Sequence, residues 1–479
     1  MSAAAEPLEH IVPDDNLARR NAMVLSAAQA LAGGNNTVIV STASIVGAVL
    51  APDKGLATLP VTAMVFGMWI GTLPLGVLAR KFGRRFALQC GSTFGVLSGL
   101  ISYSAVMNGN FWLLLFGTFC GGLYAAAHQS YRFAAADTAS DAYRPKVVSW
   151  VLAGGVFAAV LGPQLVIFTK DLLTPHLFAA SYLGQSVCAV AAACVLQFVK
   201  VPPLAAPRHG SVRPLGEIVQ SARFIVAVAC GIASYALMNM LMTSAPLAMV
   251  GCGHSVTDAA LGIQWHVLAM YAPSFVTGSL IARFGVERIT GVGLALIAAT
   301  AVVGISGLSV AHFWTALVLL GVGWNLSFIG ATTMVTQCHR PHERNKVQAF
   351  NDFLIFGSMA VSSFSSGQLL DKFGWATINE VIFPTIFVTG ALLVWHSRCG
   401  RGPLRSRSPP AGAPPLKAGQ TRIKGHPNSA LRTPWLFGYI RALTGRGEAP
   451  LQAAILDAPG AGGSVRLAST IQNRGKWPP

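Results

Sequence analysis

A few ionisable side chains stand inside long apolar segments, and they are the residues best able to do chemistry. His128, Gln129 and Arg132 share one segment, whereas His266 and Asp352 fall in two others. Ionisable residues in a lipid-spanning segment are costly and usually functional. His128 and Arg132 are four residues apart, so one helix face presents both. We predict that Arg132 binds a negative or carbonyl group of a substrate, and that Asp352, His266 and His128 are candidates for proton coupling.

Three of these side chains also have a structural explanation, and the sequence leaves both the functional and the structural interpretation open. Arg132 is near enough to the end of its segment to extend toward the membrane surface. His266 could hydrogen-bond to a neighbouring helix, and Asp352 lies near the start of its segment, where the helix dipole stabilises a carboxylate.

The composition predicts that these residues sit in a membrane protein. Hydrophobic residues make up 53% of the 479 and charged residues 11%, compared with roughly 25% charged in a soluble domain. The 50 glycines allow close packing of membrane helices. The net charge of +17 is concentrated in short clusters between apolar runs and in the C-terminal stretch. We therefore expect the lipid bilayer, not nucleic acid, to be the partner.

The apolar runs predict an all-α membrane protein with twelve transmembrane helices, since a span needs about 20 apolar residues. We place them at 22–49, 60–79, 86–107, 111–136, 147–169, 177–199, 222–250, 257–282, 288–309, 311–336, 347–370 and 378–397. Apart from Lys54, Lys170 and Lys372, the basic residues of the loops fall on one side. Positive charge stays inside, so we expect a multi-pass protein of the cytoplasmic (inner) membrane with both termini cytoplasmic.

Two halves of six helices follow from an internal repeat. Residues 76–83 (GVLARKFG) match 278–285 (GSLIARFG) at an offset of 202, and 144–147 (RPKV) match 344–347 (RNKV). Chance matching of short loops is the alternative to a repeat.

The predicted organisation has five parts. They are a cytoplasmic segment 1–20, a first half 21–199, a central linker 200–221, a second half 222–398 and a tail 399–479. The tail is basic and rich in Pro and Gly, so we expect it to be disordered. Its abrupt change of composition suggests an extension without a role in transport.

The loop after the second span resembles the best-known motif of the major facilitator superfamily, G-x-L-[AS]-D-[RK]-x-G-R-[RK]. In this family the loop latches the halves on the cytoplasmic side through its Asp, here replaced by Arg80. Arg cannot accept a hydrogen bond, so we expect Arg84 to pair with Asp137. The alternative is that the basic loop only sets topology. The predicted cytoplasmic gate consists of Gly76, Leu78, Arg80, Gly83, Arg84, Arg85 and Asp137.

The resemblance implies two pseudo-symmetric halves and transport of a small molecule by alternating access, with a proton gradient as driver. Helices one, four, seven and ten then line the cavity, which implies Asn36, Arg132, Asn239 and Asn325 as substrate contacts. Segments containing Gln264-Trp265-His266, Trp324-Asn325 and Asn351-Asp352 are also similar to a bacterial group that includes proposed riboflavin carriers. The candidate cavity residues are Asn36, His128, Gln129, Arg132, Asn239, Gln264, Trp265, His266, Trp324 and Asn325.

Other functions remain as alternatives. Gly162-Pro163 is the intact remnant of the family's exporter signature, so a drug or metabolite exporter stays open. A non-transporting membrane receptor is the alternative from another class. We expect no enzyme, because no metal cluster or nucleophile with a paired base is visible. The eight Cys show no ligand spacing, so we expect no metal. No phosphate-binding loop occurs, so we do not expect ATP as the direct fuel. We also expect no cofactor and a monomer.

Overall fold

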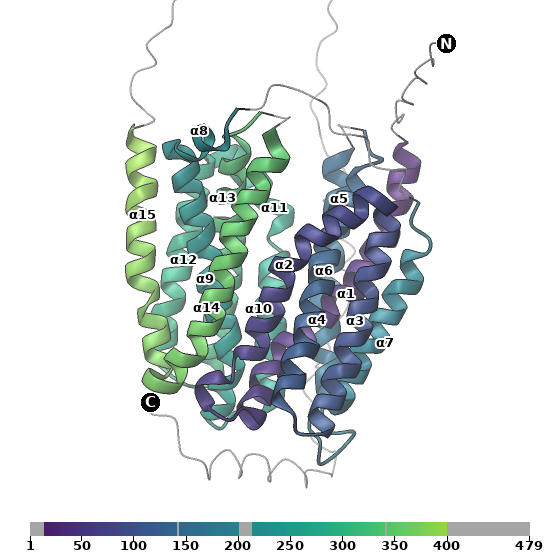
Figure 1. Cartoon of the computed structure of the whole chain (residues 1–479). Coiled ribbons are helices and arrows are strands. Elements are labelled where there is room, and N and C mark those ends of the chain that lie inside the picture. The colour runs from purple at the N-terminus through teal and green to yellow at the C-terminus, as the bar shows by residue number, and fades with distance from the viewer. Residues whose placement is uncertain (1–13, 141–142, 201–212, 341–342, 400–479) are drawn as a thin grey trace, which may run out of the picture. The chain divides into compact units, whose positions relative to one another are not determined.

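The computed structural model describes residues 14–140, 143–200, 213–340 and 343–399, and within these ranges it is helical with no strand (Figure 1). The predicted tail therefore lies outside the described residues, apart from its first residue. The first half contains α1 (Asp15–Leu50), the short η1 (Lys54–Leu56), α2 (Leu59–Phe82), α3 (Arg84–Met107), α4 (Phe111–Gln129), α5 (Tyr131–Ala136), α6 (Arg144–Thr169) and α7 (Ala179–Leu196). The second half contains α8 (Leu215–Val219), α9 (Ala222–Gly251), α10 (Val256–Tyr271), α11 (Ser274–Phe284), α12 (Val286–Ser306), α13 (Val310–Thr336), α14 (Arg344–Glu380) and α15 (Ile382–Cys399).

The described helices agree with an all-α membrane fold. Ten stretches are long and apolar enough to cross a membrane, or eleven when α10 and α11, bent by 42°, count as one. One of the ten, Lys346–Arg398, contains a break at Gly374, where φ is 78°. Each of the twelve predicted segments thus contains helix, although 111–136 and 257–282 are each divided between two helices. The number of membrane crossings stays a prediction.

Two helix–helix turns have the same backbone conformation in both halves. Gly83 joins α2 to α3 with φ 88° and ψ 157°, and Gly285 joins α11 to α12 with φ 90° and ψ 148°. This region of backbone space is open essentially only to glycine. Because these glycines end the matching sequences 76–83 and 278–285, the geometry supports the proposed repeat.

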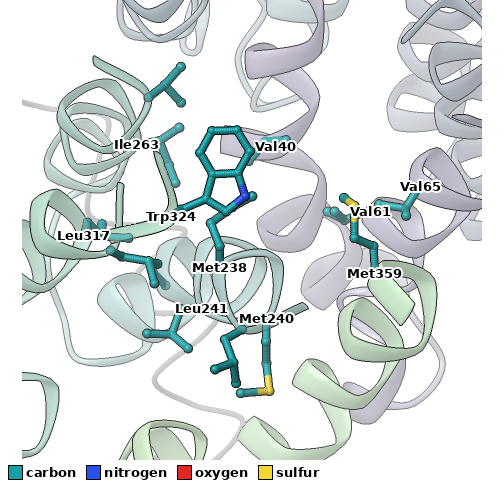
Figure 2. Close-up of a cluster of buried hydrophobic side chains, with 14 of the residues drawn as sticks. Val40, Val61, Val65, Met238, Met240, Leu241, Ile263, Leu317, Trp324 and Met359 are labelled. Atoms are coloured by element: carbon teal, nitrogen blue, oxygen red, sulfur yellow. The ribbon is translucent and has the colours of Figure 1, made fainter. Parts of the chain in front are cut away.

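The two halves share one apolar core near the end of α1. We call the two ends of the bundle the Asp15 end and the Leu50 end, after the first and last residues of α1. The shared core joins the later part of α1 and the early part of α2 to α9, α10, α13 and α14. Figure 2 shows its side chains from both halves, among them Val40, Val61, Val65, Met238, Met240, Leu241, Ile263, Leu317, Trp324 and Met359.

At the Asp15 end each half has a core of its own. One cluster contains only residues between Ala18 and Val199, and another only residues between Ile218 and Leu393. The described residues therefore join the halves tightly at the Leu50 end and pack them separately at the Asp15 end.

Polar contacts between the halves are arranged in two equivalent pairs of helices. The α2–α14 side includes Thr58 Oγ1, which donates to the Ser363 carbonyl at 3.1 Å. The α6–α10 side includes Gln164 Nε2, which donates to Gln264 Oε1 at 2.8 Å. The second and eighth predicted spans correspond in the repeat, as do the fifth and eleventh, so the two contacts occupy equivalent places.

Two residues of the central linker, Lys200 and Arg213, are each bound to one half. Asn21 of α1 exchanges hydrogen bonds with the backbone of Lys200, at 2.8 and 3.1 Å. Arg213 donates through Nε and Nη2 to the buried carboxylate of Glu343, both at 2.7 Å. These bonds, and one from the Arg340 N–H, hold the pKa of Glu343 well below its usual range.

Candidate functional site

A cavity of about 210 Å³ lies toward the Asp15 end, at the boundary between the halves. Most of its lining comes from α2 to α5 of the first half, including Gln129, Arg132 and Phe133. The second half contributes Asp352 and Phe356 of α14. The cavity thus brings together three of the candidates for substrate contact or proton coupling, Gln129, Arg132 and Asp352.

The predicted span 111–136 is interrupted at Ser130, so His128 and Arg132 belong to different helices, α4 and α5, and do not share the face of one continuous helix as predicted. The Ser130 N–H and hydroxyl both bond to the Ala127 carbonyl, at 3.0 and 2.7 Å, which ends α4 in a tight turn. The Arg132 guanidinium then lies over the Phe133 ring, 4.9 Å from its centroid. Its Nε is buried and has no hydrogen-bond partner among the described residues.

Asp352 faces Arg132 from the other half. Its Oδ1 accepts a hydrogen bond from Asn351 Nδ2 at 3.1 Å. The next residue, Phe353, packs on Trp69 of α2 with ring centroids 5.0 Å apart, which holds α14 against α2 at this level. Asp352 and Arg132 interact electrostatically, yet in the described part of the chain no ion pair joins them.

The gate residues surround the same end of the bundle. Arg84, in the cavity wall, forms two hydrogen bonds with Asp137, one of them Nη2 to Oδ1 at 3.2 Å. Arg85 donates to Gln197 Oε1 at 2.6 Å, and Arg80 is exposed. Gly76 is in the cavity wall, Leu78 is half-buried and Gly83 makes the turn. Asp137 is thus the acid beside Arg84, while a latching role stays a prediction.

The two candidate histidines are packed inside the protein. His128 is 5% exposed, and its Nδ1 lies 3.5 Å from Gln29 Nε2 of α1. The His266 side chain is fully buried, and its Nδ1 bonds to the Leu317 carbonyl of α13 at 2.7 Å. Neither lines the cavity. For His266 this is the structural alternative anticipated from the sequence.

Asn325 stabilises the bend between α10 and α11. Pro273 has no N–H to continue the helix, and Asn325 Nδ2 donates to the Met270 carbonyl and to Ser274 Oγ, both at 2.6 Å. Asn325 Oδ1 accepts from Thr277 Oγ1 at 2.6 Å. The Asn325 amide thus binds one carbonyl and two hydroxyl groups at the bend. This arrangement favours a positioning role for Asn325.

The remaining candidates lie outside the cavity lining. Asn239 Nδ2 donates to the Met359 carbonyl at 3.1 Å, and Asn36 Oδ1 is buried without a partner among the described residues. Trp324 stacks on Phe328 with centroids 5.1 Å apart, whereas Trp265 is exposed at the surface of α10. Gln264 is held by Gln164, as described above. Substrate contact by these residues stays a prediction.

Sequence reasoning missed the two aromatic walls, Phe133 and Phe356. The signal was available, because Phe133 follows Arg132 directly and Phe356 is one helical turn after Asp352, on the same face. Phe356 also packs edge-on against Tyr235, 6.2 Å between centroids. This contact connects the cavity to the aromatic group of Tyr235, Trp324 and Phe328.

Comparison with known proteins gives a consistent family. The Major Facilitator Superfamily model matches residues 25–353 and 228–447. The riboflavin transporter RfnT of Brucella anthropi is 49% identical over 376 residues, which cover 78% of this chain and 94% of that protein. An uncharacterised transporter of Bacillus subtilis, YddS, is 27% identical over 377 residues, or 74% of this chain and 86% of its own.

Two solved structures have the same fold. The nucleoside transporter NupG superposes with a TM-score of 0.61 at 12% identity, covering 79% of this chain and 99% of its own. A bacterial homologue of the lysosomal transporter Spinster, in an inward-facing and unoccupied conformation, gives 0.60 at 15% identity over 80% and 98% of the two chains.

Proposed function

Because the chain belongs to the major facilitator superfamily and is a multi-pass membrane transporter of a small solute, we propose that it carries riboflavin or a closely similar flavin. A relative 49% identical along nearly its whole length is a riboflavin transporter, which supports a flavin as substrate. The observation that carries the site is the cavity, to which one half contributes Arg132 and Phe133 and the other Asp352 and Phe356.

Transport proceeds by alternating access in this proposal, with the two halves rocking around the cavity. The shared core at the Leu50 end and the separate cores at the Asp15 end support it, because the described residues pack both halves into one buried cluster at the first end and into two clusters at the second. With both termini in the cytoplasm of the cell, the conformation described here faces inward. The gate around Arg84 and Asp137 closes that end when the cavity opens outward.

A proton gradient drives the cycle, and Asp352 is the preferred carrier of the coupled proton. Of the three candidates, His128 and His266 are packed against neighbouring helices. Asp352 alone of the three lines the cavity among the described residues, where substrate and proton can both reach it. The protein acts as a monomer, because each half of the site comes from the same chain.

A thermal-stability screen of the purified protein tests the substrate class. Riboflavin at about 100 times its dissociation constant should add roughly 2.7 kcal/mol to native stability. Nucleosides, sugars and amino acids serve as controls and should leave the midpoint unchanged. Shifts from varied apolar cations without a shift from riboflavin would contradict the proposal and favour the drug-exporter alternative.

A further inference from the structure

Two opposite charges line the same cavity, and no ion pair joins them in the part of the chain that the structure describes. Arg132 comes from α5 and Asp352 from α14, and each belongs to a different half. Among the described residues, the Arg132 Nε–H has no acceptor, and the hydrogen bond given to Asp352 reaches Oδ1 and not Oδ2. Charges inside a membrane protein are normally paired or bound to a ligand, so the space between these two is suited to a group that bonds to both.

The walls of the cavity indicate the shape of that group. Each charge is accompanied by an aromatic ring, Phe133 beside Arg132 and Phe356 one turn after Asp352. The two rings come from different halves of the protein, and aromatic lining favours a flat, aromatic ligand. The volume of about 210 Å³ is below the roughly 300 Å³ at which drug-sized sites begin, so the cavity holds one end of such a ligand.

The donors and acceptors indicate its chemistry. An ionised carboxylate only accepts hydrogen bonds, and a guanidinium only donates them. Gln129 adds a side-chain amide to the same lining, and within the described ranges this amide makes no hydrogen bond. One acceptor with donors beside it complements an N–H flanked by carbonyl oxygens, which is an imide edge. The pyrimidinedione ring of a flavin presents this edge through its N3–H and two carbonyls.

We propose that Arg132 and Asp352, one residue from each half of the protein, form a binding site for the imide edge of the flavin, which we call the imide site. Asp352 accepts the N3–H and Arg132 donates to an adjacent carbonyl, while Phe133 and Phe356 flank the ring. This inference rests on the flavin transport proposed above. It makes Asp352 a specificity-determining residue, because a ligand without the N–H leaves the carboxylate desolvated and unpaired.

Binding of riboflavin and of N3-methylriboflavin to the full-length protein in nanodiscs tests the imide site. The methyl group removes the N–H and leaves the tricyclic ring and the sugar chain unchanged. Wild-type protein should bind riboflavin roughly 10- to 100-fold more tightly than the methylated analogue, the range expected for a hydrogen bond to a charged group. Fluorescence quenching of the flavin gives both dissociation constants.

Two variants of similar size separate hydrogen bonding from steric exclusion. Asp352→Asn keeps an accepting oxygen and should keep a preference for riboflavin. Asp352→Leu lacks one, so riboflavin binding should fall to the level of the analogue and the ratio should approach one. A preference that persists unchanged in Asp352→Leu overturns the inference, since the methyl group is then rejected elsewhere. If Asp352→Leu keeps the preference but transports poorly, the two charges act instead as a gate and form an ion pair when the site closes.

The wild-type measurement tests the imide site even if the Asp352→Leu variant does not fold. Equal affinity for the two flavins overturns the imide site and leaves the proposal of riboflavin transport intact. If the protein binds neither flavin, both the proposed function and the imide site are overturned.

Discussion

At the scale of single residues, the main feature is an arginine that, in the described part of the chain, lacks a hydrogen-bond acceptor for one of its buried N–H groups. Arg132 has a buried Nε without an acceptor among the described residues, and its guanidinium rests on Phe133. A purely structural arginine in a membrane protein is expected to pair with a carboxylate or backbone carbonyl. Arg84 does so with Asp137. The contrast between the two arginines favours ligand binding by Arg132.

Replacing Arg132 with Ala should weaken riboflavin binding by roughly 10- to 100-fold, because a charged hydrogen bond to the ligand is lost. Arg283→Ala is the matched control. Its guanidinium also lies over the ring of the next residue, Phe284, at 5.2 Å, but it is absent from the cavity lining. Equilibrium binding to the purified variants measures the effect. Normal affinity in Arg132→Ala would remove this residue from the site.

Part of the candidate site could be predicted at this scale. Charge inside an apolar segment identified Arg132 and Asp352, and the missing acid of the loop motif pointed to Asp137 as the residue beside Arg84. The surroundings of His128 and His266 could not be predicted. Their neighbours Gln29 and Leu317 are distant in the sequence, and no local pattern distinguishes a packed histidine from a cavity histidine.

At the scale of helices, close approach of backbones sets how the first half packs. A Cβ added at Gly122 of α4 would lie 2.0 Å from the Met64 carbonyl oxygen of α2. Gly122→Ala should therefore push the two helices apart and cost about 1–3 kcal/mol of stability, as overpacking does. The midpoint of thermal unfolding in detergent measures it.

Gly278→Ala is the control for this substitution, because nothing lies within 4 Å of the added atom. In a helix, Ala is preferred over Gly, so this variant should be as stable as wild type or slightly more so. Equal stability of both variants would contradict the packing described for α2 and α4.

The contact between the linker and the second half should respond to pH in a defined direction. Because Arg213 lowers the pKa of Glu343, the carboxylate stabilises the folded state above its unfolded pKa, near 4.3. This contribution is lost as the pH falls through the lower, folded value. Glu343→Gln should lower the unfolding midpoint by several degrees at pH 7. The difference from wild type should shrink below about pH 4, and a difference that is constant over this range would argue against the ion pair.

Helix positions were largely predictable, but the breaks inside them were not. Apolar length placed a helix in each of the twelve segments, since the lipid sets that length. The turn at Ser130 and the 42° bend after Tyr271 depend on which neighbours satisfy the freed backbone groups. Asn325, which does so at the bend, lies more than 50 residues away along the chain.

At the scale of the whole molecule, we expect the function to need only the two halves. The last described helix, α15, ends at Cys399, and the alignment with the riboflavin transporter covers 94% of that protein with 376 residues. Deleting residues 405–479 should therefore leave the riboflavin transport rate per folded molecule unchanged. The rate would be compared with full-length protein at equal amounts of folded protein. A well-folded truncation that has lost transport would assign a role to the tail.

The measurement that tests the central claim most directly is riboflavin counterflow in liposomes containing the purified full-length protein. Vesicles loaded with unlabelled riboflavin should take up labelled riboflavin well above the level of protein-free vesicles, because the two halves alternate around a loaded site. Asp352→Asn should retain this exchange but lose accumulation driven by a proton gradient. Folded protein that binds riboflavin yet gives the protein-free rate would contradict the account, and would describe a receptor instead of a carrier.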